Sequence, residues 1–125
     1  MQRDKESVSR IIIDKLLEKS GWILEDQPNP NVITEVRSNG DSYYVMLDSQ
    51  NNHLCVIEAK RPGKHPLSAK RQSRNYAKSL GCNLIILSNG NSHYLWNIES
   101  GNPQRTYRFP TQKRLEESIK ELGLT

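Results

Sequence analysis

The apolar run NLIILS, residues 83–88, constrains the fold more than any other feature of the chain. A continuous apolar strand is typical of a central strand that is buried on both faces of a sheet. Three β-rich segments precede it, at 32–37, 42–47 and 54–59, and the last two are joined by the polar residues DSQNNH. This arrangement is the signature of a β-hairpin. We therefore expect a sheet that is flanked by helices.

The remaining elements follow from helical spacing and turn residues. Helices are expected at 4–20, 67–80 and 111–122, and a further strand at 92–98. Gly21 and Gly81 end the first two helices, and Thr111 is the N-cap of the third. The order α-β-β-β-α-β-β-α predicts an α/β fold with a mixed four- to five-stranded sheet. A length of 125 residues suits a single domain over 1–125.

The cysteines and the absence of long apolar segments indicate the compartment. Cys55 and Cys82 lie far apart within apolar runs, which favours buried free thiols in a reducing cytoplasm over a disulfide or metal site. No N-terminal stretch resembles a signal peptide, and no run approaches the length of a membrane span. We expect a cytoplasmic protein without a membrane partner.

Positive charge is concentrated in one segment. The net charge is +4, but residues 55–80 hold seven basic side chains and a single acidic one, Glu58. Such a segment favours a polyanionic partner, most simply DNA. The alternative is a helix face that is merely solvated. The candidate DNA-binding residues are Arg61, Lys64, Lys70, Arg71, Arg74 and Lys78.

Glu58 and Lys60 stand two residues apart at the end of the predicted strand 54–59. If the hairpin turns at the middle of DSQNNH, Glu58 lies opposite Tyr43 and Lys60 opposite Asp41, all on one side of the sheet. Two carboxylates and a lysine around one point are the parts of a Mg²⁺-dependent phosphodiesterase. A surface salt bridge is the alternative. We expect Glu58 and Lys60 near the surface, where truncation costs little stability.

Four motifs in order resemble one nuclease family. VIEAK follows the hairpin, RQSRNYA lies on the next helix, ESVSRIIIDKLLEKSGW opens the chain, and LIILSNGNSHYLWN follows the second helix. Together they resemble the PD-(D/E)xK nuclease superfamily, and most the N-terminal nuclease domain of type I restriction enzyme R subunits. The resemblance implies a restriction-endonuclease-like αβββαβ core and a Mg²⁺- or Mn²⁺-dependent DNA endonuclease. It also implies motor, methyltransferase or specificity subunits as partners.

The same resemblance assigns roles to individual residues. With Asp41 taken from the hairpin register, the candidate catalytic residues are Asp41, Glu58, Lys60, Gln72 and Tyr76, and the candidate metal ligands are Glu6, Asp41 and Glu58. Glu6 has an alternative as an exposed first-turn residue stabilised by the helix dipole. Tyr76 has an alternative as a core aromatic. Lys70, Arg74 and Lys78 recur every four residues and either contact DNA phosphates or solvate the helix.

The chain departs from the family at one position. The family places its metal-binding Asp in a pattern like ADYVL, whereas this chain has SYYVML, with Tyr43 at that place. Asp41 lies on the same face, about 7 Å further along the strand, and a bulge would bring it closer. Without such a bulge a ligand is lost, and the domain is a catalytically impaired DNA-binding or assembly module on the same fold. We favour Asp41 as the replacement.

Overall fold

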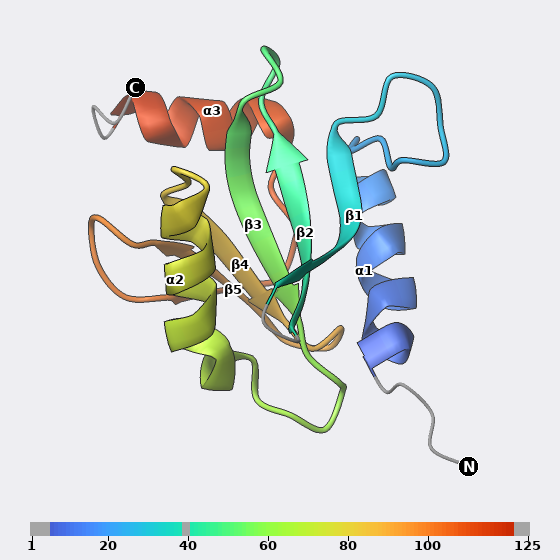
Figure 1. The fold of residues 1–125 in the computed structure, drawn as a ribbon, viewed down its shortest axis with the longest axis vertical. Coiled ribbons are helices and arrows are strands. Elements are labelled where there is room, and N and C mark those ends of the chain that lie inside the picture. The colour runs from blue at the N-terminus through green and yellow to red at the C-terminus, as the bar shows by residue number, and fades with distance from the viewer. Residues whose placement is uncertain (1–5, 39–40, 122–125) are drawn as a thin grey trace.

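The computed structural model describes residues 6–38 and 41–121, and at positions 6, 35, 38, 41, 120 and 121 it describes the backbone alone. In chain order the elements are α1 (Glu6–Lys19), β1 (Val32–Ser38), β2 (Asp41–Leu47), β3 (His53–Ala59), the 3₁₀ helix η1 (Pro66–Ala69), α2 (Lys70–Ser79), β4 (Leu84–Ser88), β5 (His93–Asn97), β6 (Gln104–Thr106) and α3 (Gln112–Glu121). Figure 1 shows their arrangement. The predicted order of elements is confirmed, and β6 is the one strand that was not expected.

The strands form one mixed sheet in the order β1-β2-β3-β4-β5-β6. β3 and β4 are parallel, and all other neighbouring strands are antiparallel. The sheet therefore has six strands where four to five were predicted. The additional strand β6 is three residues long and buries none of its side chains, so it carries no apolar pattern by which it could be recognised.

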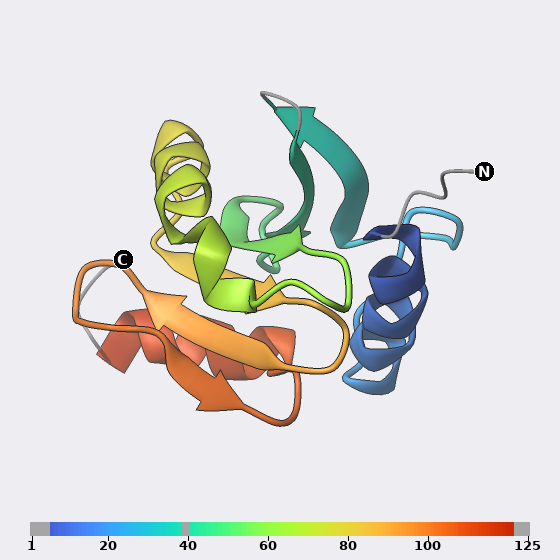
Figure 2. The same ribbon diagram turned by 90° about the horizontal axis from the view of Figure 1, so that it is seen from below.

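Helices cover both faces of this sheet (Figures 1 and 2). On one face, side chains of α1 and α3 such as Ile13 and Leu115 join a core cluster with Ile57 and Ile86. On the other face, Ala77 of α2 joins a second cluster with strand residues such as Ile85. All five residues of β4 are buried. The prediction of a central strand between two helical layers is therefore confirmed.

The ends of the helices follow the expected chemistry. The Thr111 hydroxyl accepts from the backbone N–H of Arg114 at 3.1 Å, as predicted for an N-cap. The helix expected from 67 begins instead as η1, whose N-cap is His65: its Nδ1 accepts from the N–H of Leu67 at 3.1 Å. Pro66 at the first helical position has no N–H to satisfy, which favours this start.

The turn between β4 and β5 packs tightly on α1. Gly90 has φ +90°, and a Cβ there would lie 3.2 Å from the Cα of Ser9. The Ser9 hydroxyl lies 2.8 Å from the carbonyl of Asn89 and 2.6 Å from that of Lys60. The Asn89 amide in turn donates to the carbonyl of Lys64 at 2.9 Å. These contacts join α1, the turn and the loop after β3 at the end of the sheet that holds Lys60.

Cys55 and Cys82 are free and buried, as predicted. Burial raises the pKa of the Cys82 thiol to about 12 and that of Cys55 well above its ordinary value. Both thiols are therefore protonated and unreactive near neutral pH. Among the residues that the structure describes, no helix is long and apolar enough to cross a membrane.

Candidate active site

The register of the hairpin places Tyr43 opposite Glu58. The pairs run without interruption from Met46 and Cys55 to Tyr43 and Glu58, as the sequence predicts. The irregularities of register lie between Ile33 and Val36 in β1 and between Met46 and Leu47 in β2. The described pairing therefore shows no bulge at the Tyr43 end of β2 that would bring Asp41 toward Glu58.

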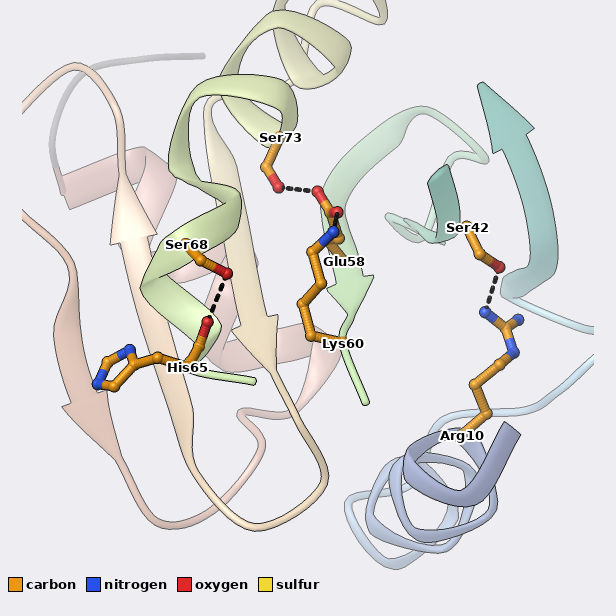
Figure 3. A network of polar contacts seen from close by, with 7 residues as sticks. All are labelled: Arg10, Ser42, Glu58, Lys60, His65, Ser68 and Ser73. Carbon is orange, nitrogen blue, oxygen red and sulfur yellow. Dashed lines mark hydrogen bonds and ion pairs between the residues drawn. The ribbon is translucent and has the colours of Figure 1, made fainter. Parts of the chain in front are cut away.

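Glu58 and Lys60 form a buried ion pair. Lys60 Nζ lies 2.7 Å from Glu58 Oε2, and the side chains are 9% and 0% exposed. The Ser73 hydroxyl of α2 donates to the other carboxylate oxygen, Oε1 (Figure 3). The expectation that Glu58 and Lys60 lie near the surface is therefore wrong. The small residues Ser73 and Ala77 allow α2 to lie closely over the end of β3, and this excludes water from the pair.

The backbone of Lys60 is held by two neighbouring elements. Its N–H donates to the carbonyl of Ser88 at 2.8 Å, which extends the contact with β4 by one residue. Its carbonyl accepts from the Ser9 hydroxyl of α1. Because the backbone is fixed beyond the end of β3, the side chain can return toward Glu58 in a defined geometry.

Two stacked tyrosines occupy the space beside this pair. The rings of Tyr43 and Tyr76 have centroids 4.2 Å apart at an interplanar angle of 21°. Tyr43 is 2% exposed, and Tyr76 packs against the same core cluster from α2. Burial raises the pKa of the Tyr76 phenol. Tyr76 therefore has the packing role that was its alternative, and its catalytic role stays a prediction.

The family resemblance led us to expect Gln72 at the site of Glu58, but Ser73 is the residue of α2 that lies there. Gln72 is exposed, whereas Ser73 is buried and bonded to Glu58. The small residues Ala69, Ser73 and Ala77 recur every four positions and mark the buried face of the helix. This spacing is visible in the sequence and could have identified Ser73. A catalytic role of Gln72 remains a prediction.

Two of the three predicted metal ligands lie outside the described side chains. Asp41 begins β2 and its backbone pairs with Ser38, and Glu6 begins α1, but neither side chain is described. Among the described side chains, no group of three His, Cys, Asp or Glu residues could hold a metal ion. Within the described side chains, the site therefore offers the single carboxylate of Glu58, which is paired with the ammonium group of Lys60. Mg²⁺ prefers several oxygen ligands, so these described groups do not by themselves fit the ion.

A second polar cluster, which the sequence did not reveal, joins α1 to β2. Arg10 is 7% exposed, and its Nη1 donates to the Ser42 hydroxyl at 2.7 Å (Figure 3). Its guanidinium lies 4.4 Å from the ring centroid of Tyr44, and the Tyr44 hydroxyl donates to Asp14 at 2.6 Å. These contacts hold β2 at Ser42 and Tyr44, the neighbours of Tyr43, on the sheet face opposite Glu58.

Most of the predicted DNA-binding residues are exposed. Exposed side chains are those of Arg61, Lys64, Arg71, Arg74 and Lys78. Lys70 is half-buried, and its ammonium group lies 5.1 Å from the ring centroid of Trp96. We name the exposed basic residues of α2, Arg71, Arg74 and Lys78, the basic face of α2. Their exposure is compatible both with phosphate contacts and with simple solvation.

The fold and the family follow from comparison with known proteins. A fragment structure assigned to the HsdR subunit of a type I restriction enzyme from Vibrio vulnificus YJ016 matches with a TM-score of 0.77 at 18% identity. The match covers 98% of this chain and 27% of that one, and at this identity it shows the fold. The family described as "Type I restriction enzyme R protein N terminus" matches residues 5–110. The chain belongs to this family. No curated protein matches it.

Proposed function

We propose that the chain is a DNA-binding domain of restriction-nuclease fold in which an internal ion pair takes the place of a metal site. The observation that carries this proposal is the position of Tyr43. It lies directly opposite Glu58, is 2% exposed and stacks on Tyr76. The cross-strand position that would add a carboxylate beside Glu58 is therefore filled by an aromatic ring.

The contacts of Glu58 support the same conclusion. Its Oε2 lies 2.7 Å from an ammonium group and its Oε1 accepts from Ser73. A cation would have to compete with Lys60 for a carboxylate that is already neutralised. On this proposal, cleavage by the natural chain is absent or weak, and the fold serves to hold DNA or to assemble with other subunits.

A second candidate is a Mg²⁺- or Mn²⁺-dependent endodeoxyribonuclease that uses Asp41 and Glu6 with Glu58. The pair of Glu58 and Lys60 favours it, because α1, β4 and α2 all bond to it at the end of β3. The sequence expectation that Asp41 shares the strand face of Tyr43 also favours it, because side chains alternate along a strand. These two candidates differ in whether the natural chain binds the metal.

Calorimetric titration with Mg²⁺ and Mn²⁺, together with plasmid nicking, separates the candidates. We expect the parent to show no metal-binding heat and no metal-dependent nicking. Tyr43→Asp should acquire metal binding, because two facing carboxylates favour a divalent cation between them. Tyr43→Asn is the matched control, since it removes the same ring without adding a charge. Nicking by the parent that disappears in Asp41→Asn would instead establish the second candidate.

DNA binding itself should be sequence-tolerant and dependent on salt. If the segment from Lys60 to Lys78 makes three to five phosphate contacts, log affinity should fall with log salt with a slope of about −2.7 to −4.5. Fluorescence anisotropy with a labelled duplex over a salt series measures this slope. A slope near zero, or no binding at low salt, would refute the proposal.

Other subunits would supply the functions that this sequence lacks. No Gly-rich phosphate loop occurs in the 125 residues, so we propose that a motor lies elsewhere on a longer chain or on a partner. Methyltransferase and specificity subunits would provide the choice of target. We propose the cytoplasm as the place of action, because DNA and a reducing environment for both free thiols are found there.

A further inference from the structure

An exposed row of rings and cations lies at the edge of the sheet, separate from the buried ion pair. Tyr107 is 77% exposed, and the Arg105 guanidinium carbon lies 5.0 Å from its ring centroid. The same carbon lies 5.9 Å from the ring centroid of Tyr94, whose ring is 5.8 Å from that of His65. We name His65, Tyr94, Arg105 and Tyr107 the edge patch.

The scaffold holds the edge patch in place. Tyr94 and Arg105 are cross-strand partners in β5 and β6. The Thr106 hydroxyl donates to the carbonyl of Arg108 at 2.8 Å, which fixes the bend that carries Tyr107. The Nδ1 atom of His65 accepts a hydrogen bond from the backbone N–H of Leu67. The backbone carbonyl of His65 accepts one from the Ser68 hydroxyl (Figure 3). The backbone that carries these side chains is therefore fixed before a ligand binds, which lowers the cost of ordering on binding.

The edge patch has exposed basic residues as its neighbours in the sequence and lies on the side of the sheet that α2 covers. Arg105, Arg108 and Lys64 are exposed. Tyr94 and Trp96 belong to the same cluster as α2, so they face the side of the sheet that carries the basic face of α2. Figure 2 shows η1 lying over β5 on this side. The patch is thus an aromatic extension of the surface proposed to contact DNA.

We propose that the edge patch binds a single-stranded nucleic acid segment, with a base stacked on Tyr107 and the adjoining phosphate beside Arg105. This inference rests on the proposed DNA binding and extends it from duplex phosphates to unpaired bases. An exposed aromatic ring beside cations suits such a ligand, because every base has a face that can stack and every phosphate is negative. In a duplex the base faces are covered by their neighbours, so Tyr107 would contribute to single strands alone.

The test compares single strands with duplex for the same variants. Anisotropy is measured with a labelled mixed-sequence DNA oligonucleotide, its duplex and the RNA of the same sequence, at one salt concentration. Tyr107→Ala should lower affinity for the single strand about tenfold, in the range of one lost stacking contact, and leave duplex affinity within about twofold, because phosphate contacts remain. Tyr107→Phe should retain the parent's affinity, since the ring is kept. The RNA arm shows which sugar the patch accepts.

A control and the opposing outcomes complete the design. Ile11→Ala removes another exposed apolar side chain, 60% exposed on α1, and should change neither affinity. Single-strand affinity that is unchanged in Tyr107→Ala, or lost equally for duplex, would overturn the inference. A parent that binds duplex but no single strand would overturn it and leave the proposed function standing. A parent that binds neither would overturn both, and would leave the edge patch as a surface for a protein subunit.

Discussion

Two regions of one stretch of sequence, residues 58–78, differ in burial: the charged residues at its start are buried, and those near its end are exposed. At its start, Glu58 and Lys60 are 1% and 7% exposed and bonded to each other. Later in the stretch, Arg74 and Lys78 are also basic, like Lys60, but they are exposed on α2. A charge in the first region is costly to change because its partner is left buried, whereas a charge in the second affects mainly what the protein binds.

The largest expected effect comes from breaking the buried pair on one side. Lys60→Met should lower the free energy of unfolding by about 3–5 kcal/mol at neutral pH, because the carboxylate of Glu58 stays buried without its ammonium partner. Urea denaturation measures the change. The double variant Glu58→Gln with Lys60→Met should recover much of the loss, since no net charge is then buried. A single variant as stable as the parent would contradict the buried ion pair.

The hydrogen bond from α2 should have a smaller effect. Ser73→Ala removes the donor to Glu58 Oε1 and should cost about 1.5–3 kcal/mol, as expected for a hydrogen bond to a charged group. Ser79→Ala is the matched control on the same helix, because its exposed hydroxyl donates only to the carbonyl of Tyr76. It should change stability by less than about 0.5 kcal/mol. If both variants lost the same stability, the buried hydrogen bond to Glu58 would contribute no more than the exposed one, which would contradict this prediction.

His93, a buried residue of β5, provides a pH-dependent contribution to stability. Burial, and then the charge of Arg105, lower its pKa from the ordinary 6.5. Below pH 6.5 the unfolded chain therefore binds a proton that the native protein does not, and stability falls until the pH has passed the lowered pKa. Each unit of depression corresponds to about 1.4 kcal/mol. Thermal melting from about one pH unit above the ordinary value to about two units below it should show a steeper decline for the parent than for His93→Gln. Parallel profiles would contradict the depressed pKa.

The smallest effect on stability is expected on the basic face of α2. Arg74→Ala should change the free energy of unfolding by less than about 0.5 kcal/mol. If Arg74 contacts a phosphate, the salt slope of duplex binding should decrease in magnitude by about 0.9. Lys113→Ala on α3, which covers the other face of the sheet, is the charge-matched control and should leave the slope unchanged. A large stability loss in Arg74→Ala would remove the contrast between the two regions.

Much of the fold could be predicted because its signals are local. The hairpin register that pairs Tyr43 with Glu58 follows from the length of the polar turn and the alternation of the strands. The N-cap at Thr111 and the turn at Gly90 depend on a few neighbouring residues. β6 escaped prediction because an exposed edge strand of three residues needs no apolar pattern.

The candidate site could be predicted only in part. The residues Glu58 and Lys60 and their position at a strand end were recognised, but their burial was not. Ser73 was missed although its spacing with Ala69 and Ala77 marks a buried helix face. The bond between Arg10 and Ser42 joins residues 32 positions apart, and no local pattern indicates such a contact.

The sequence by itself determined the kinds of element, their order and the strand face on which Glu58 lies, because these depend on alternation, helical spacing and turn residues over short distances. Only the tertiary structure decided that Glu58 and Lys60 form a buried pair and that Tyr43 stacks on Tyr76. The physical reason is that burial requires α2 to pack over β3. This brings together Glu58 and Ser73, which are 15 positions apart in the sequence, at a distance that small side chains on the helix permit. Whether a charge is solvated or buried is thus decided by the layer above it.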